Sequence, residues 1–484
     1  MENKRNNWII FLILLWAIVL LYMACRFAGL PGETGWPIKV SMGICLLLCV
    51  YVTVKEYDGG TLTYDVLVKR ILFVGIVMRI GYTLYTGCTV RAHDIWMDTP
   101  DVHGHEDYIL HLLEYGNLPD SNDVQLYQQP LFYILGAAVS KGINAVLGAG
   151  SAYELVDAAK VISCLASCCS LFVAKRTLEV CGLKEKGLVR GMILMAFLPA
   201  FYLSGGNVTP DMLSGLFLML AFLFTIYWWK NPSWKHTILL AVIYGFGMMT
   251  KVSMGVMAVA TAIIFLIALV RALQEHRGKT LVKKYCVFGL ISLPLGLWFS
   301  VRNYICFGQS LFYIMPLSKT SEIYTGDHSL VERFISLDIG NLLKTPYADA
   351  WSDCNLPVYQ LKSSLFGEYS FDVGMIVPTL LLLSAAVLAV FCVASFVKMI
   401  RERTWTMPQK FAWMTAIWMY LSSIWFYYSY PFGCSMDYRY LLALTLPVAI
   451  VLGSCRFHRQ KVELWLDLTC GGFALGSCLM YCLI

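Results

Sequence analysis

Apolar residues in this chain come in blocks of about 20, separated by short polar segments, and this pattern constrains the fold most strongly. An α-helix of that length crosses a hydrocarbon core roughly 30 Å thick. A transmembrane β-barrel would show short segments of alternating hydrophobicity instead. Hydrophobic residues make up 58% of the sequence and charged residues 14%, whereas a soluble domain has roughly 25% charged residues. We therefore predict an all-α polytopic membrane protein.

The sequence contains about thirteen such blocks, and we predict that each one crosses the membrane. The blocks lie at residues 8–26, 37–54, 71–90, 155–174, 190–206, 211–229, 237–250, 253–270, 285–301, 373–397, 409–430, 439–454 and 463–482. The first block follows a basic flank but is too long for a signal peptide, and no small-residue cleavage site follows it. We interpret residues 1–484 as a single integral membrane domain.

The distribution of Lys and Arg predicts the orientation of these spans. Loops on the cytoplasmic side of a membrane are rich in Lys and Arg. The basic runs therefore predict a protein of the plasma membrane whose N-terminus lies in the cytoplasm. The net charge of +6 then reflects topology, and we predict no nucleic-acid partner. Two long segments, 91–152 and 303–371, fall on the outer face. Within the first, residues 130–148 are apolar, but a crossing there would turn every later basic run outward, so we predict a helix lying along the outer membrane surface.

Residues 91–129 form a polar, acidic segment in an otherwise apolar sequence. Its carboxylates are Asp94, Asp98, Asp101, Glu106, Asp107, Glu114, Asp120 and Asp123, and its histidines are His93, His103, His105 and His111. Asp94 and Asp101 directly follow the third predicted span, where a carboxylate can be partly desolvated and serve as a general base. The alternative is that the loop is acidic for solubility and topology alone.

A metal site is another interpretation of this segment, since His103, His105, Asp101 and Asp107 are all competent ligands. Their spacing matches neither a structural zinc site nor the H-E-x-x-H of a zinc protease. We therefore predict no metal ligands and no cofactor. A loose site for a hard divalent cation stays open as the alternative.

Three cations lie at the outer ends of different predicted spans, opposite to the positive-inside rule. They are Lys251, Arg302 and Arg439. An anionic ligand would explain them, because Arg presents a planar fork to phosphate oxygens and Lys a point charge. The alternative is interfacial anchoring, or pairing with a nearby carboxylate. The candidate partners for such pairing are Asp211, Glu368 and Asp437.

Several short motifs occur in a characteristic order from about residue 70 onward. They are R-A-H-D at 91–94, G-H-E-D-Y-I at 104–109, G-N-L-P at 116–119, Y-Q-Q-P-L-F-Y at 127–133, T-P-D-M at 209–212, M-T-K-V-S at 249–253, R-N-Y-I-C-F-G at 302–308, L-K-S-S-L-F-G-E-Y-S-F at 361–371 and D-Y-R-Y at 437–440. In this order and spacing the chain resembles the GT-C glycosyltransferases, and among them the bacterial relatives of protein mannosyltransferases and of the lipid A aminoarabinose transferase. These are multi-span enzymes that use lipid-phosphate-linked sugars.

The resemblance implies roles for particular residues. The catalytic carboxylate of the family lies in the first outer loop, which implies Asp94, with Asp101 as the reserve. The residues implied to bind substrate are Arg91, His93, His105, Asp107, Tyr108, Gln129, Lys251, Arg302, Glu368 and Arg439. Gln129 departs from relatives that carry Lys or His before Pro-Pro-Leu, which weakens a phosphate contact expected there.

The expected reaction follows from this chemistry. A polyprenyl phosphate is a good leaving group, so the enzyme needs cations to hold it and a base for the acceptor hydroxyl. Direct displacement at the anomeric carbon inverts its configuration. The expected partners are a polyprenyl-phosphate sugar, membrane lipid and an acceptor that the sequence does not identify.

Two other functions stay open at this point. A transporter or lipid flippase is also polytopic, but it places polar residues near the bilayer midplane on broken helices. Here they gather on one face beside a long outer loop. A polysaccharide polymerase or ligase shares lipid-linked donors and uses a large later outer loop rich in Arg and His. Segment 303–371 has the length for that role, but Arg333 is its only arginine.

Overall fold

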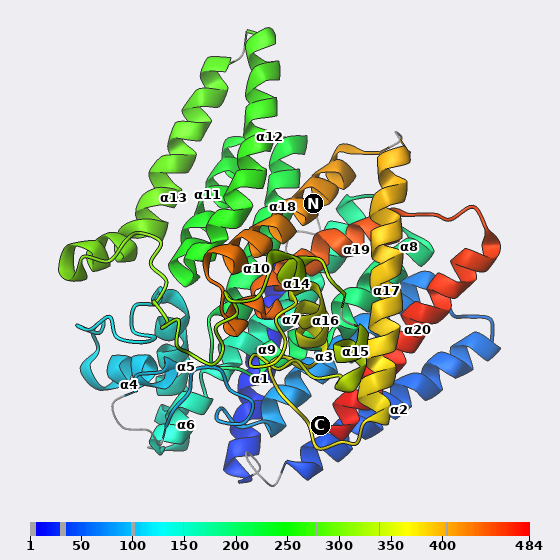
Figure 1. The fold of residues 1–484 in the computed structure, drawn as a ribbon, viewed down its shortest axis with the longest axis horizontal. Helices are drawn as coiled ribbons and strands as arrows, with labels where there is room; N and C mark the ends of the chain where they lie inside the picture. The colour runs from blue at the N-terminus through cyan, green and yellow to red at the C-terminus, as the bar shows by residue number, and fades with distance from the viewer. Residues whose placement is uncertain are drawn as a thin grey trace. The chain divides into compact units, whose positions relative to one another are not determined.

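The computed structural model describes residues 6–29, 35–97, 102–148, 150–276, 278–337, 339–402 and 405–484. In these ranges all regular elements are helices, and no β-strand forms (Figure 1). The chain divides into two compact units, which are described separately. The prediction of a single domain over residues 1–484 stays a prediction.

The first unit comprises Met1–Thr34, Thr86–Val173 and Gly205–Met315. Its helices are α1 (Asn6–Phe27), α4 (His105–Tyr115), α5 (Leu131–Leu147), α6 (Ala152–Asp157), α10 (Asp211–Lys230), α11 (Trp234–Thr250), the 3-10 helix η2 (Val252–Met254), α12 (Gly255–Gln274) and α13 (Gly278–Phe307). Helix α11 packs against α10 and α13, and α12 packs against α10 and α13. Figure 1 shows α12 and α13 in green as neighbouring long helices.

The second unit comprises Gly35–Tyr85, Ala174–Ser204 and Pro316–Ile484. Its helices are α2 (Trp36–Asp58), α3 (Tyr64–Tyr85), α8 (Glu185–Phe197), α14 (Leu330–Phe334), α15 (Ile339–Lys344), α16 (Leu356–Phe366), α17 (Ile376–Arg401), α18 (Met407–Ser429), η3 (Gly433–Met436), η4 (Tyr438–Leu444), α19 (Thr445–Ser454) and α20 (Gln460–Leu483). Helices α7 (Lys160–Val180) and α9 (Pro199–Gly205) each begin in one unit and end in the other. Helix α17 runs beside α20 (Figure 1).

Nine helical segments in the described ranges are long and apolar enough to cross a membrane. They are Ile9–Phe27, Trp36–Asp58, Ala152–Val180, Asp211–Lys230, Val252–Gln274, Gly278–Phe307, Ile376–Arg401, Gly433–Ser454 and Gln460–Leu483. The pair Glu185–Phe197 and Pro199–Gly205, bent by 41°, gives a tenth if it forms one span. The chain is therefore an integral, multi-pass membrane protein.

The remaining three predicted spans correspond to helices that are less apolar or shorter. Helix α3 carries Asp65, Lys69, Arg70 and Arg79 within its 22 residues, α11 has only 17 residues, and α18 is rich in Trp and Tyr. The predicted number of about thirteen spans thus stays a prediction. The third predicted block, 71–90, was wrong in its bounds, because α3 ends at Tyr85 and residues 86–90 lie beyond it.

Helices α4 and α5 position the polar loop. Gly104 precedes α4, and Gly116 ends it in the left-handed conformation, with φ of 69°, that favours glycine. The apolar segment predicted at 130–148 forms α5, a helix of 17 residues that contacts α1, α4 and α6. The position of α5 along the membrane surface stays a prediction.

A buried ionic network attaches the first helix to the rest of its unit. The Tyr22 hydroxyl donates a hydrogen bond of 2.7 Å to Oδ2 of Asp157, whose Oδ1 accepts from the Cys88 backbone N–H at 2.8 Å. Nζ of Lys160 lies 2.7 Å from the same Oδ1, and both side chains are 1% exposed. One turn further along α1, Arg26 pairs with Glu154 at 3.2 Å. The N-terminal helix is thus held to α6 and α7 by charge and hydrogen bonding as well as by apolar contact.

Candidate functional site

Asp94 lies in the first unit on a backbone turn that few residues adopt. Its φ is 52°, in the left-handed region, where Asp and Asn are more common than other side chains. The carbonyl oxygen of Asp94 accepts a hydrogen bond of 2.9 Å from the His105 backbone N–H, at the start of α4. Nε2 of Gln125 donates a hydrogen bond of 2.8 Å to Oδ2 of the Asp94 carboxylate. The backbone of Asp94 is therefore fixed by His105, and its half-buried carboxylate is oriented by Gln125.

Among the described carboxylates of segment 91–129, Glu106 is the most deeply buried. Its side chain is only 2% exposed, and Oε1 accepts a hydrogen bond of 2.7 Å from the Trp96 backbone N–H. Burial raises the pKa of Glu106, the nearby charges of Asp107 and Asp94 raise it further, and the hydrogen bond from Trp96 acts in the opposite direction. The carboxylate lies in the first turn of α4, where the helix dipole favours a negative charge. Glu106 thus connects the loop before α4 to the helix itself.

Two histidines of the loop, His103 and His105, have different neighbours in the described structure. Nδ1 of His103 lies 2.9 Å from Oδ2 of Asp107, and Nδ1 of His105 lies 2.7 Å from the Tyr133 hydroxyl. The Tyr133 ring stacks on that of Tyr108 with centroids 4.0 Å apart. His105, Tyr108 and Tyr133 are buried and join α4 to α5. In this part of the chain, packing of the loop explains these residues.

The remaining predicted residues of the loop occupy different settings. Arg91 and His93 are half-buried, and Arg91 has a φ of 53°. Gln129 is 4% exposed, and its Nε2 donates a hydrogen bond of 3.1 Å to Oγ of Ser300 on α13. Asp101, the reserve candidate for the base, lies outside the described residues.

The two predicted cations of the first unit both have carboxylate neighbours. Nζ of Lys251 is bonded to Oδ1 of the buried Asp211 at the start of α10. Nη2 of Arg302 donates a hydrogen bond of 2.7 Å to the Pro119 carbonyl and lies 3.6 Å from Asp120, which is 94% exposed. An ion pair with so exposed a partner is weak. The exposed Asp120 therefore compensates the positive charge of Arg302 only weakly, which leaves Arg302 able to attract another anion. The charge of Lys251 is largely compensated by Asp211.

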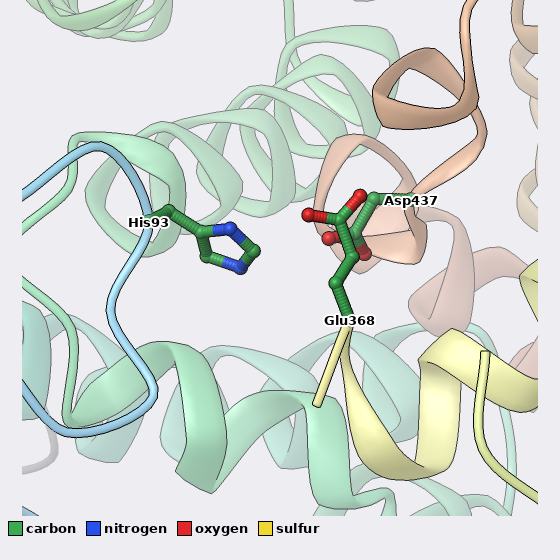
Figure 2. A group of neighbouring side chains, drawn as sticks. All are labelled: His93, Glu368 and Asp437. Atoms are coloured by element: carbon green, nitrogen blue, oxygen red, sulfur yellow. The ribbon is translucent and has the colours of Figure 1, made fainter. Parts of the chain in front are cut away.

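The other two predicted site residues, Glu368 and Arg439, belong to the second unit. The Tyr359 hydroxyl donates a hydrogen bond of 3.0 Å to Oε1 of Glu368, and a carboxylate oxygen of Glu368 lies within 4.8 Å of one of Asp437 (Figure 2). Burial and then these two carboxylates raise the pKa of Tyr359. Nε of Arg439 lies 3.7 Å from Oδ2 of Asp437. His93, also labelled in Figure 2, belongs to the first unit.

Sequence reasoning missed two residues that shape the surroundings of Asp94. Gln125 was not proposed, because its contact joins positions 31 residues apart in a segment without periodicity. Glu106 appeared only as one of many acidic residues. Its place in G-H-E-D, in the first turn of a helix after a glycine, was the available signal.

One family of known proteins matches part of the chain. Residues 137–298 match the family described as dolichyl-phosphate-mannose-protein mannosyltransferase. This match covers about a third of the sequence and confirms the predicted resemblance to GT-C glycosyltransferases. The search of curated proteins gives no match.

Solved structures of two other proteins are similar at low sequence identity. ArnT from Cupriavidus metallidurans in its apo state has 11% identity and a TM-score of 0.49, covering 87% of this chain and 75% of ArnT. The same protein bound to undecaprenyl phosphate has 12% identity and a TM-score of 0.47, covering 93% and 77%. An oligosaccharyltransferase from Archaeoglobus fulgidus, tethered with an acceptor peptide, has 10% identity and a TM-score of 0.46, covering 85% and 55%.

Proposed function

We propose that this chain is a membrane glycosyltransferase that transfers a sugar from a polyprenyl-phosphate-linked donor to an acceptor at the outer face of the membrane. The observation that carries the proposal is the match of residues 137–298 to a family whose description names dolichyl-phosphate-mannose, a sugar linked to a polyisoprenyl phosphate. Such a donor is anchored in the bilayer by its lipid. An enzyme with many membrane-spanning helices is suited to bind it there.

In this proposal Asp94 is the general base. Gln125 holds Oδ2 of the carboxylate at 2.8 Å, and we assign the acceptor hydroxyl to Oδ1. The acceptor oxygen attacks the anomeric carbon while its proton passes to Asp94. The bond between the anomeric carbon and the phosphate oxygen breaks, and its electron pair leaves with the lipid phosphate. Attack opposite to the leaving group inverts the anomeric configuration.

Cations stabilise the departing phosphate in the same proposal. Arg302 is the main candidate, because its nearest carboxylate, on Asp120, is exposed and 3.6 Å away. Lys251 contributes less, because a phosphate must compete with the bonded Asp211. Arg91, His93, Glu368 and Arg439 stay proposed substrate contacts. Asp101 stays the reserve base.

The proposed orientation places the N-terminus in the cytoplasm and Asp94 outside. It follows from the distribution of basic residues and from the polar loop that leads into α4. No metal ion or other cofactor takes part in the proposed reaction. The base and the cations are all supplied by side chains of the chain itself.

The experiment that tests the class of enzyme is a transfer assay with several donors. Membranes containing the full chain are incubated with radiolabelled mannose, glucose, galactose and aminoarabinose, each linked to a polyprenyl phosphate. The label recovered in lipid, glycan and protein fractions is compared with that from membranes lacking the chain. We expect transfer from at least one donor. Equal label in both membranes for every donor would overturn the proposal.

A further inference from the structure

A small pocket opens in the first unit beside the C-terminal end of α13. It has about 20 Å³ of space that a water-sized group can reach, far below the roughly 300–1,000 Å³ of sites that enclose a whole ligand. Its polar lining includes Tyr127, Gln128, Gln129, Ser300, Asn303 and Gln309, and we call it the amide pocket. Among the described residues that line it, none is charged. A pocket of this kind suits a neutral, polar part of a ligand and not a phosphate.

Two buried side chains in the amide pocket keep unused hydrogen-bonding capacity. Gln129 is 4% exposed and Gln309 is 5% exposed. Gln129 bonds to Ser300 through Nε2, but within the described structure its Oε1 has no hydrogen-bond partner, and neither has Nε2 of Gln309. Buried polar atoms are normally satisfied, because leaving one unpaired destabilises the folded state. The residues that line the pocket thus include one buried acceptor and one buried donor without a partner in the described structure.

A hydroxyl group is the simplest partner for both atoms. It donates one hydrogen bond and accepts others, whereas a carboxylate only accepts and an ammonium only donates. The rings of Tyr127 and Tyr313, with centroids 5.1 Å apart in an edge-to-face arrangement, add an aromatic surface to the same lining. Polar amides beside an aromatic face are suited to the hydroxyl and C–H faces of a sugar.

A chain of side-chain hydrogen bonds connects the amide pocket to Asp94. Nε2 of Gln128, which lines the pocket, donates to Oε1 of Gln125 at 3.0 Å. Nε2 of Gln125 in turn donates to the Asp94 carboxylate at 2.8 Å. Two amide groups therefore link the pocket lining to the proposed base, and each amide fixes the orientation of the next.

We propose that the amide pocket is a binding subsite for a hydroxyl-bearing part of the transferred sugar, recognised by Gln129 and Gln309. The inference rests on the proposed function, since it places part of the donor sugar next to the proposed base. The small volume admits a substituent of the sugar and not a whole glycan. Gln129 is then a specificity residue in place of the phosphate contact expected from relatives.

Direct binding tests this subsite without any transfer reaction. The purified full-length chain is examined by saturation-transfer NMR with the methyl glycosides of mannose, glucose, galactose and arabinose. We expect at least one glycoside to bind, and its affinity to fall about five-fold in Gln129→Met and in Gln309→Met, the loss typical of one hydrogen bond. Met keeps the length of Gln, and unchanged melting temperatures show that the variants fold. Gln274→Met, an exposed position at the end of α12, is the matched control.

The outcomes separate failure of the subsite from failure of the proposed enzyme. Equal binding of every glycoside to wild type and to both variants, including no binding at all, would overturn the subsite. In the transfer assay, the subsite predicts a higher donor KM in both variants with the acceptor KM unchanged. A raised acceptor KM instead would assign the pocket to the acceptor and overturn the proposal as stated. An active enzyme with unaltered KM values in both variants would remove the subsite and leave the function standing.

Discussion

The side-chain amide of Gln125 donates a hydrogen bond of 2.8 Å to the Asp94 carboxylate, across 31 positions of the loop. Gln125 is 8% exposed, so this bond is shielded from water. It fixes the direction of Oδ2 on a residue whose backbone is already in an uncommon conformation, with φ of 52°. The proposed base is thus oriented by a partner that carries no charge.

Gln125→Leu is expected to lower kcat of sugar transfer by about ten-fold or more, since a hydrogen bond to a charged group contributes roughly 1.5–3 kcal/mol. The donor KM should change much less, because Gln125 orients Asp94 and does not contact the donor in the proposed reaction. Steady-state transfer assays separate kcat from KM. A Leu variant with wild-type kcat would show that this hydrogen bond does not orient the base.

Glu106 predicts a pH-dependent stability. Burial raises its pKa in the folded state, so the folded protein binds this proton more tightly than the unfolded chain. The associated stability is present below the unfolded pKa and is lost as pH rises through the folded pKa. The melting temperature of wild type minus that of Glu106→Gln should therefore be larger at pH 4 than at pH 7. A difference that stays constant with pH would contradict the proposed burial of Glu106.

We predict that position 104 does not tolerate a side chain even as small as a methyl group. A Cβ built there would lie 2.1 Å from Oε2 of Glu106 and 2.4 Å from the Asp94 carbonyl oxygen. Gly104→Ala should displace the turn and lower both melting temperature and transfer rate. Gly142→Ala is the control, because a Cβ at this helical position meets nothing within 4 Å. That change should be neutral or stabilise the protein by up to about 1 kcal/mol.

The buried network that holds α1 predicts which of two variants, Asp157→Ala or Tyr22→Phe, is the less stable. Asp157→Ala leaves the ammonium of Lys160, 1% exposed, without its counter-charge, and should cost about 3–5 kcal/mol. Tyr22→Phe removes one hydrogen bond to the Asp157 carboxylate and should cost less, about 1.5–3 kcal/mol, which is typical of a hydrogen bond to a charged group. Denaturant unfolding of the purified variants measures both. A Tyr22→Phe variant less stable than Asp157→Ala would contradict this account of the network.

Much of the helical architecture could be predicted from the sequence, because runs of apolar residues record directly where a helix can face lipid. Helices such as α17 and α20 were predicted within a few residues of their bounds. The end of α3 at Tyr85 was missed, since the sequence from there to Val90 contains no charged residue. Hydropathy marks what is apolar and does not mark where the backbone turns.

The candidate site was less predictable for a physical reason. Asp94 was chosen from its place at the end of a span, and no finding tests that choice. The contacts around it, from Gln125 and through Glu106 to Trp96, depend on how an irregular loop folds back on α4. Hydrogen bonds from amide groups to the carboxylates of an irregular loop leave no periodic pattern in a sequence. For Lys251, the bonded Asp211 is the partner that sequence analysis had given as the alternative to a ligand.

The most direct test of the proposed mechanism compares transfer by wild type, Asp94→Asn and Asp123→Asn in the same membranes with the donor that wild type uses. Asp123 is an exposed carboxylate of the same loop, hydrogen-bonded only locally to Ser121 in the described structure. Loss of a general base lowers the rate by about 100-fold or more, so Asp94→Asn should lose nearly all transfer while Asp123→Asn keeps it. Full activity in Asp94→Asn would contradict the assignment of Asp94 as the base.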